Sequence, residues 1–285
     1  MGRSHECDYP PEVEKLPVCT RPRFDTSGNS LEIDTLVKEC LGSALSVYEV
    51  FDDVLEQLQP THILTQTQCE VCAVSLKDVQ RSVAGRLRSN PCIVALEPNW
   101  LEDIWSDINR VAASVGMDGE PTVVRLRERA SEISERAHQD PKRPSVACIE
   151  WIEPLMAAGN WVPELVQMSN GRNLFGFPGK HSPWMEWQDL RTADPEIVVI
   201  MPCGFPIDRT VSEMHWLESR PGFRELRAVR ERRVYLADGN QYFNRPGPRV
   251  VDSLQILAEI LHPETVSPQL EGIGFVPFTP AASCG

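Results

Sequence analysis

The sequence predicts an α/β protein of two lobes, each with a largely parallel sheet. Three observations predict this fold class. With 285 residues, the chain is longer than one compact core of ordinary size requires. The order helix, proline, strand and second strand occurs in both halves, and a long polar helical stretch separates the halves. Short buried strands that alternate with helices need crossover connections, which make neighbouring strands parallel.

The repeat aligns residue by residue. In the first half, VYEVFDDVLEQLQP has apolar residues on one helical face and a proline that ends the helix, and the strand HILTQ (62–66) follows. In the second half, WQDLRTADPEIVVIMPCGF has the same order. The alignment pairs Leu55 with Leu190 and Pro60 with Pro195. A further strand follows in each half, in VALEPN (94–99) and VYLADGN (234–240).

The repeat and the stretch between its copies divide the chain into four parts. We expect an N-terminal lobe at 1–98, a helical connector at 99–144, a C-terminal lobe at 145–264 and a tail at 265–285. Within the connector, apolar spacing predicts one helix from Leu101 to Gly116 and another from Pro121 to about His138. The tail is Pro-rich and has no apolar period, so we expect it to pack loosely.

Composition limits the possible partners. The formal net charge of −13 repels phosphate backbones and anionic headgroups, so we expect no nucleic acid partner. The nine cysteines, an odd number spread over a long chain, are typical of a reducing compartment. No run approaches the roughly 18 apolar residues of a membrane helix, and no apolar signal segment opens the chain. As it stands, the sequence predicts a soluble, cytoplasmic protein without membrane insertion.

The loops after the repeated strands have unusual compositions: QTQCEVCAVS (66–75) in the first lobe and PCGFPID (202–208) in the second. Ligands of α/β sheets bind beyond the carboxyl ends of the strands, so a site is expected there. Cys69 and Cys72 have the spacing of half a zinc site or of a redox pair. A zinc ribbon needs a second close pair, which the sequence lacks, so tight packing of the loop is the favoured interpretation.

The segment CIEWIEPLMAAGNWVPELVQMSNG (148–171) predicts a strand, a loop and a short helix. Trp151 and Trp161 flank the loop, and their flat apolar faces suit a planar or bulky ligand. Near the chain end, a further strand-end loop contains Tyr242 and Arg245. Pro248 then stands near the first turn of an apolar helix.

Common catalytic motifs are absent from the sequence: there is no nucleophile elbow, Walker loop, H-E-x-x-H or strand-linked G-x-G-x-x-G. Four carboxylates could act as acids or bases only if the fold brings them together, namely Glu6, Asp8, Glu70 and Glu153. His181, His215 and His262 show no metal-ligand spacing and receive no role. The motifs therefore give no sign of a catalytic centre or of a catalytic metal.

Five segments in order give the chain a family resemblance: HECDYPPEV, TQTQCEVCAVS, EWIEPLMAAGNWVPELV, PCGF and DGNQYFNRPGPRVVD. Together they resemble the cobalamin-binding subfamily of the iron-siderophore/cobalamin substrate-binding proteins of ABC transporters. The resemblance implies two Rossmann-like lobes joined by one long rigid helix, with the ligand in the cleft between the lobes. It also implies a monomer that binds a corrinoid and delivers it to a permease without chemistry.

The same resemblance implies the ligand contacts by position. The first lobe would contribute His5, Glu6, Cys7, Tyr9, Gln66, Gln68, Cys69 and Glu70. The second lobe would contribute Trp151, Trp161, Cys203, Gly204, Phe205, Tyr242 and Arg245. Among these residues His5 is the first candidate for an axial ligand of cobalt, with a cysteine as the alternative. Glu70 is a candidate for docking arginines of the permease.

One departure from the family concerns the start of the chain. Members begin with a strand and a helix ahead of the HECDYP segment, whereas Met1 and Gly2 stand at that point here. We expect that the first strand and helix of lobe one are missing because the start is placed too far downstream. A signal segment would then be missing too, and the location would be periplasmic or otherwise extracytoplasmic.

Three other functions remain open from the sequence. An iron-siderophore or haem carrier predicts more cationic residues around the ligand than Arg245 alone. A metal-dependent enzyme using Cys69, Cys72, Cys203 and Glu153 predicts stoichiometric zinc or iron in the purified protein. A structural or regulatory remnant predicts that no ligand binds, even to a chain extended upstream.

Overall fold

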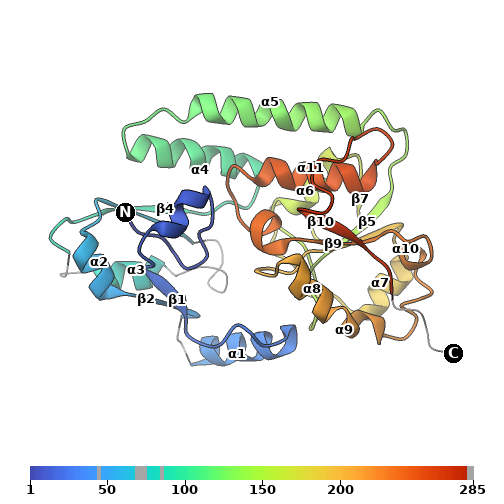
Figure 1. Cartoon of the computed structure of the whole chain (residues 1–285), viewed down its shortest axis with the longest axis horizontal. Helices are drawn as coiled ribbons and strands as arrows, with labels where there is room; N and C mark the ends of the chain where they lie inside the picture. The colour runs from blue at the N-terminus through green and yellow to red at the C-terminus, as the bar shows by residue number, and fades with distance from the viewer. Residues whose placement is uncertain (44–45, 68–75, 84–86, 281–285) are drawn as a thin grey trace. The chain divides into compact units, whose positions relative to one another are not determined.

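The computed structural model describes residues 1–43, 46–67, 76–83 and 87–280, which form two compact units (Figure 1). Unit 1 comprises Met1–Pro98 and Ser106–Gly119, and unit 2 comprises Asn99–Trp105 and Glu120–Gly285. Helices alternate with strands in both units, and parallel pairing occurs in both. The predicted α/β fold class is confirmed.

The described residues of unit 1 form two pairs of strands. β1 (Thr20–Pro22) pairs antiparallel with β2 (Tyr48–Val50), and β3 (His62–Gln66) pairs parallel with β4 (Cys92–Leu96). Its helical segments are η1 (Pro11–Lys15), α1 (Ser30–Gly42), α2 (Asp52–Leu58) and α3 (Leu76–Val83). The start of α1 is stabilised by a capping box, in which the side chains of Asn29 and Glu32 each accept the other residue's backbone N–H.

The predicted connector helices are both present. They are α4 (Leu101–Ser114), whose residues are divided between the units, and α5 (Glu120–Ala137), which lies in unit 2. Gly116 adopts φ 75° after α4, a conformation that favours glycine and ends the helix. Within unit 2, α5 packs against α11 (Val250–Leu261).

The sheet of unit 2 has the strand order β10, β9, β8, β5, β6, and β7 also pairs with β5. The strands are β5 (Ser145–Trp151), β6 (Met156–Ala157), β7 (Arg172–Asn173), β8 (Ile197–Ile200), β9 (Val234–Ala237) and β10 (Phe275–Phe278). β5, β8 and β9 run parallel in the centre of the sheet. All seven residues of β5 are buried, which is typical of a parallel strand covered on both faces.

Helices cover the sheet of unit 2. One face carries alternate apolar side chains, Ala147, Ile149, Val198, Ile200, Val234 and Leu236. They pack against the segment that contains α7 (Trp187–Ala193), α8 (Ile207–Glu213), α9 (His215–Glu218) and α10 (Arg227–Arg230). Figure 1 shows α11 and α6 (Val162–Met168) on the opposite side of this sheet.

The predicted repeat is confirmed down to the helix ends. Gln59 directly follows α2 and Asp194 directly follows α7, and both of these capping residues have a left-handed backbone, with φ 43° and 41°. Their N–H groups donate to the aligned carbonyls of Leu55 and Leu190. The strand that follows each helix, β3 or β8, pairs parallel with the next strand of its own half.

The expectation of a loosely packed tail is wrong for Phe275–Phe278, which form the edge strand β10 along β9. The approach to β10 is also fixed, because the buried carboxylate of Glu259 accepts the N–H groups of Gln269 (2.9 Å) and Leu270 (3.0 Å). Pro277 is tolerated because an edge strand has one unpaired side. Four residues are too few to show a period, so the pairing could not be seen in the sequence.

Candidate ligand-binding site

Apart from Trp161, the residues predicted for unit 2 lie at or just beyond the carboxyl ends of three parallel strands. Directly beyond β8, Met201 N–H donates to Ile149 O (2.8 Å) and Cys203 N–H to Glu150 O (3.1 Å). Asn240, just beyond β9, donates its N–H to Phe205 O (3.2 Å). These bonds join the loops after β8 and β9 to each other and to β5.

Phe205 lies at the centre of this arrangement. Its ring is 5.2 Å from the ring of Trp151, centroid to centroid, and the guanidinium carbon of Arg209 lies 3.8 Å from the Phe205 centroid. Both are favourable contacts for an aromatic ring. Phe205 and Trp151 are buried, whereas Gly204, in the loop after β8, is exposed, with nothing within 4 Å of an added Cβ. We call Trp151, Cys203, Gly204, Phe205, Arg209, Asn240 and Arg245 the strand-end cluster.

The loop after β9 is a single π-helical turn, η2 (Gly239–Phe243), a form often found at functional sites. Asp238 caps the turn, because its Oδ1 accepts the N–H groups of Asn240 (2.9 Å) and Gln241 (2.7 Å). Tyr242 is buried within the turn. Arg245 Nη2 donates to Asn240 Oδ1 (2.6 Å), which connects the guanidinium to the cluster.

Gly239 allows this turn to approach the loop after β8. A Cβ at Gly239 would lie 2.1 Å from Pro202 O and 2.6 Å from Met201 O. Both are backbone atoms, so no side-chain movement could relieve the clash. The side chain of Asn244 adds a hydrogen bond to Met201 O (3.3 Å). Glycine at position 239 is therefore required by the close contact of two strand-end loops.

Trp161 is 3% exposed, immediately before α6, and its Nε1–H has no acceptor among the residues that the structure describes. On the same helix, Glu164 accepts the N–H of Leu101 (2.8 Å). Burial raises the pKa of Glu164, the Leu101 N–H opposes that shift, and the carboxylates of Asp103 and Glu102 reinforce it. Ligand contact by Trp161 stays a prediction.

In unit 1, the loop that contains His5, Glu6 and Cys7 is folded around Arg3. The Arg3 guanidinium donates to the carbonyls of Ser4 (3.1 Å), His5 (3.1 Å) and Cys7 (3.2 Å). Backbone bonds join Arg3 to the chain at 17–19. Sequence analysis missed Arg3, since a single arginine beside a polar segment gives no pattern.

His5 is partly buried and held in place by its neighbours. Its N–H donates to Thr20 Oγ1 (3.1 Å), and its Nδ1 lies 2.8 Å from the same oxygen. Its ring is 5.3 Å from the Tyr48 ring, and its Nε2 lies 3.8 Å from Glu6 Oε1. Cys7 and Tyr9 are exposed. Gln66 ends β3, whereas Gln68, Cys69, Glu70 and Cys72 lie outside the described residues.

Among the described residues, no group of three His, Cys, Asp or Glu side chains could hold a metal ion. Glu153 forms an ion pair with Arg220. Burial raises the pKa of the Cys148 thiol to about 12, and the Glu150 carboxylate acts in the same direction. Cys148 is therefore a protonated core residue.

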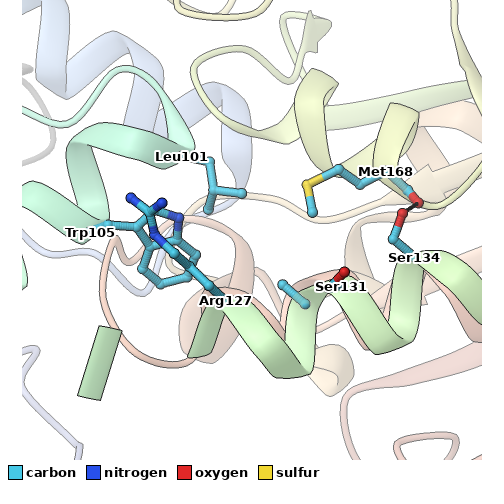
Figure 2. Close-up of a pocket in the computed structure, with 7 residues that line it drawn as sticks. Leu101, Trp105, Arg127, Ser131, Ser134 and Met168 are labelled. Atoms are coloured by element: carbon cyan, nitrogen blue, oxygen red, sulfur yellow. Dashed lines mark hydrogen bonds between the residues drawn. The ribbon is translucent and has the colours of Figure 1, made fainter. Parts of the chain in front are cut away.

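A separate groove of about 220 Å³ lies elsewhere in unit 2 (Figure 2). It is lined by α5 residues and by Leu101, Trp105 and Met168. None of the residues predicted to contact the ligand lines it.

Comparisons by sequence find no relatives: no protein-family model matches the chain, and neither does any curated protein. Among the described residues, no helix is both long enough and apolar enough to cross a bilayer.

Solved structures match the chain over most of its length. A periplasmic heme-binding protein from Pseudomonas aeruginosa is 17% identical, with a TM-score of 0.70 over 98% of this chain and 90% of that one. An ABC transporter substrate-binding protein from Listeria monocytogenes EGD-e is 13% identical, with a TM-score of 0.67 over 92% and 90%. A periplasmic vitamin B12 binding protein of Vibrio cholerae is 16% identical, with a TM-score of 0.59 over 89% and 84%. The chain therefore has the fold of the periplasmic substrate-binding proteins.

Proposed function

We propose that the protein binds a large metal chelate and delivers it to an ABC transporter without altering it chemically. The observation that carries this proposal is the strand-end cluster of unit 2, where residues from three strand ends surround Phe205. The fold supports the same proposal, because its structural neighbours include binding proteins for heme and for vitamin B12. Cobalamin is the ligand that the sequence resemblance implies, and haem or an iron-siderophore is the alternative.

The cluster has the groups that a rigid, disc-shaped ligand needs. Trp151 and Phe205 form an aromatic pair, and polar side chains such as Asn240 and Arg245 stand beside it. The exposed Gly204 leaves room for a ligand to approach the loop. Apolar and aromatic side chains with a few fixed polar groups are the usual lining of a small-molecule site.

The contribution of unit 1 follows from the resemblance and is part of the proposal. His5 would provide an axial nitrogen for cobalt or iron, and its contacts with Thr20 orient the ring. His5→Ala should then change the absorbance spectrum of bound hydroxocobalamin. An identical spectrum for the variant would exclude His5 as the axial ligand.

Binding is favoured over the metal-dependent enzyme. That alternative uses Glu153 as an acid or base, but its carboxylate is engaged by Arg220. Stoichiometric zinc or iron in protein purified without ligand would instead favour the metal-dependent enzyme.

The partner and location follow from the proposed role. Delivery to an ABC transporter places the protein outside the cytoplasmic membrane, as a carrier that docks on a permease. Glu70, the candidate docking residue, lies outside the described residues and stays a prediction.

The proposal is tested by titrating the purified chain with hydroxocobalamin and, separately, with haemin, followed by absorbance and tryptophan fluorescence. Saturable equimolar binding of either chelate supports it, and the chelate that binds defines the ligand class. If neither chelate nor a panel of iron-siderophores binds to a folded chain, the proposal is wrong.

A further inference from the structure

A parallel bridge near the start of unit 1 places one cysteine beside a turn that ends at another. The bridge joins Arg3 to Val18: Arg3 N–H donates to Pro17 O (2.9 Å), and Cys19 N–H donates to Arg3 O (2.8 Å). In this register Ser4 and Cys19, the next residues of the two segments, are neighbours. Paired strands lie about 4.8 Å apart, so the backbone of Cys19 is held close to that of Ser4.

The turn formed by residues 4–7 brings Cys7 back toward the same serine. Cys7 N–H donates to Ser4 O (3.3 Å), and Cys7 Sγ lies 3.4 Å from Ser4 Oγ. The Cα atoms at the two ends of such a turn are less than about 7 Å apart. Cys7 and Cys19 are therefore both close to Ser4. From these positions a shift of the turn is enough to reach the Cα separation of about 4.4–6.8 Å that a disulfide needs.

The two thiols differ in their surroundings. Cys7 is exposed, whereas Cys19 is buried, with its Sγ 3.7 Å from Pro17 O and so close to Gly2 that an added Cβ there would clash with it. Burial raises the pKa of the Cys19 thiol, a backbone hydrogen bond from Arg3 and the terminal ammonium oppose that shift, and negative charge on Cys7 reinforces it. A reagent in solution therefore meets Cys7 first.

We infer that Cys7 and Cys19 form a disulfide when the protein meets a small-molecule disulfide such as oxidised glutathione. The Cys7 thiolate attacks one sulfur of glutathione disulfide, so that this S–S bond breaks, a mixed disulfide forms at Cys7 and one glutathione thiolate leaves. Cys19 then loses its proton to solvent and attacks the Cys7 sulfur, which releases the second glutathione thiolate. Two protein thiols are thus oxidised, and one glutathione disulfide is reduced to two thiols.

The bond would make the loop that carries His5 and Glu6 depend on the redox state of its surroundings. It encloses η1 and joins the turn covalently to the bridged segment at 17–19. Outside the cytoplasmic membrane, where the proposed function places the protein, disulfides form and persist, whereas a reducing compartment keeps thiols free. The bond does not require a ligand, so it can be tested independently of the proposed function.

The test is oxidation of the folded chain with glutathione disulfide, followed by alkylation with iodoacetamide, digestion with trypsin and mass spectrometry. Trypsin cleaves after Lys15, between the two cysteines, so the bond is detected as a linked pair of peptides that dithiothreitol separates. We expect this linked pair in the wild-type chain. Alkylation of Cys7 should fall by about tenfold or more after oxidation and should return after reduction.

Variants separate the two steps of the reaction. Cys19→Ala should stop at the mixed disulfide, so that Cys7 keeps one glutathionyl group. Cys7→Ser should leave Cys19 unmodified, because the buried thiol then has no exposed neighbour to react with. Cys92→Ser is the matched control, because Cys92 is also exposed but lies at the start of β4, outside the bridge. Thermal unfolding of every variant checks that it is folded.

Three results would overturn the inference. In the first, Cys7 of the wild-type chain keeps glutathione and no linked pair forms, as expected for Cys19→Ala. In the second, Cys7 links to a different cysteine. In the third, the linked pair forms only in urea, so that the fold does not bring the thiols together. Failure of every chelate to bind would instead contradict the proposed function alone.

Discussion

The imidazole of His262 is completely buried at the end of α11, with Nδ1 3.1 Å from Asp140 Oδ2. Its Nε2 lies 2.9 Å from the carbonyl oxygen of Ser169. Both partners are oxygen atoms, so the ring lies between two polar groups of other segments. The side chain thus ties the end of α11 to the segment after α5 and to the end of α6.

Asp140→Asn should change how stability depends on acid. The N–H of Lys142 and the His262 ring lower the pKa of Asp140 below its ordinary value. A lowered folded-state pKa stabilises the fold above the unfolded value of about 3.9, and that stabilisation is lost as pH falls through the folded value. In urea unfolding, wild type should therefore be more stable than Asp140→Asn near neutral pH. The difference should shrink as the pH falls below about 4.

Glu264→Gln is the control for this experiment, because Glu264 is exposed and lies two residues after His262. Its stability curve should run parallel to the wild-type curve across the acid range. A constant difference between wild type and Asp140→Asn from pH 2 to pH 7 would show that the carboxylate has no such role.

Gly239→Ala should destabilise the strand-end cluster, because the new Cβ would meet two backbone carbonyl oxygens. We expect a loss of about 2 kcal/mol or more in the free energy of unfolding. Gly247→Ala is the matched control on the same loop segment, where an added Cβ has nothing within 4 Å. Equal stability of the two variants in urea would mean that the close approach at Gly239 is not required.

Trp161→Ala should lower stability by about 3–5 kcal/mol, since the indole is buried. Trp161→Phe should lower the stability much less, because phenylalanine keeps an aromatic ring and lacks the indole N–H that has no acceptor among the described residues. Phe177→Ala, at a ring that is 72% exposed, is the control and should change the melting temperature little. A similar melting temperature for Trp161→Ala and Phe177→Ala would show that Trp161 is not a core residue.

Cys148 should resist alkylation in the folded protein. Its pKa of about 12 leaves almost no thiolate at pH 8, and burial excludes the reagent. Cys7 is exposed and should be alkylated by iodoacetamide under conditions in which Cys148 of the folded protein stays unlabelled. Mass spectrometry of peptides labelled with and without urea measures both residues. Comparable labelling of Cys148 and Cys7 in the folded chain would contradict the structure around β5.

Much of the fold could be predicted because local signals agree with the tertiary structure. Leu55 and Leu190, followed by a proline at the same distance, predict two equivalent helices whose ends are indeed equivalent. Continuous apolar runs such as Ile197–Ile200 predict buried parallel strands. Strand β10 could not be predicted, because its pairing with β9 is a long-range contact of four residues.

The sequence indicated which loops to examine for a site, but it did not indicate which side chains contact one another there. Aromatic and glycine-rich loops after strands pointed to Trp151, Phe205 and Tyr242, since strand ends on one sheet edge converge. The stacking of Arg209 on Phe205 depends on the orientation of α8, which the sequence does not encode in a short pattern. The burial of Trp161 likewise depends on packing around α6 that no local period reveals.

Binding of a metal chelate at the strand-end cluster is tested most directly by equilibrium dialysis of Gly204→Asn beside Gly116→Asn. Both glycines have φ 75° and open space around them, so the two substitutions add the same side chain at the same backbone strain. Gly204 stands in the cluster and Gly116 follows α4. We predict equimolar binding of hydroxocobalamin or haemin by wild type and Gly116→Asn, and binding weaker by about tenfold or more in Gly204→Asn. Equal binding by both folded variants, or no binding by wild type, would contradict a ligand site at this cluster.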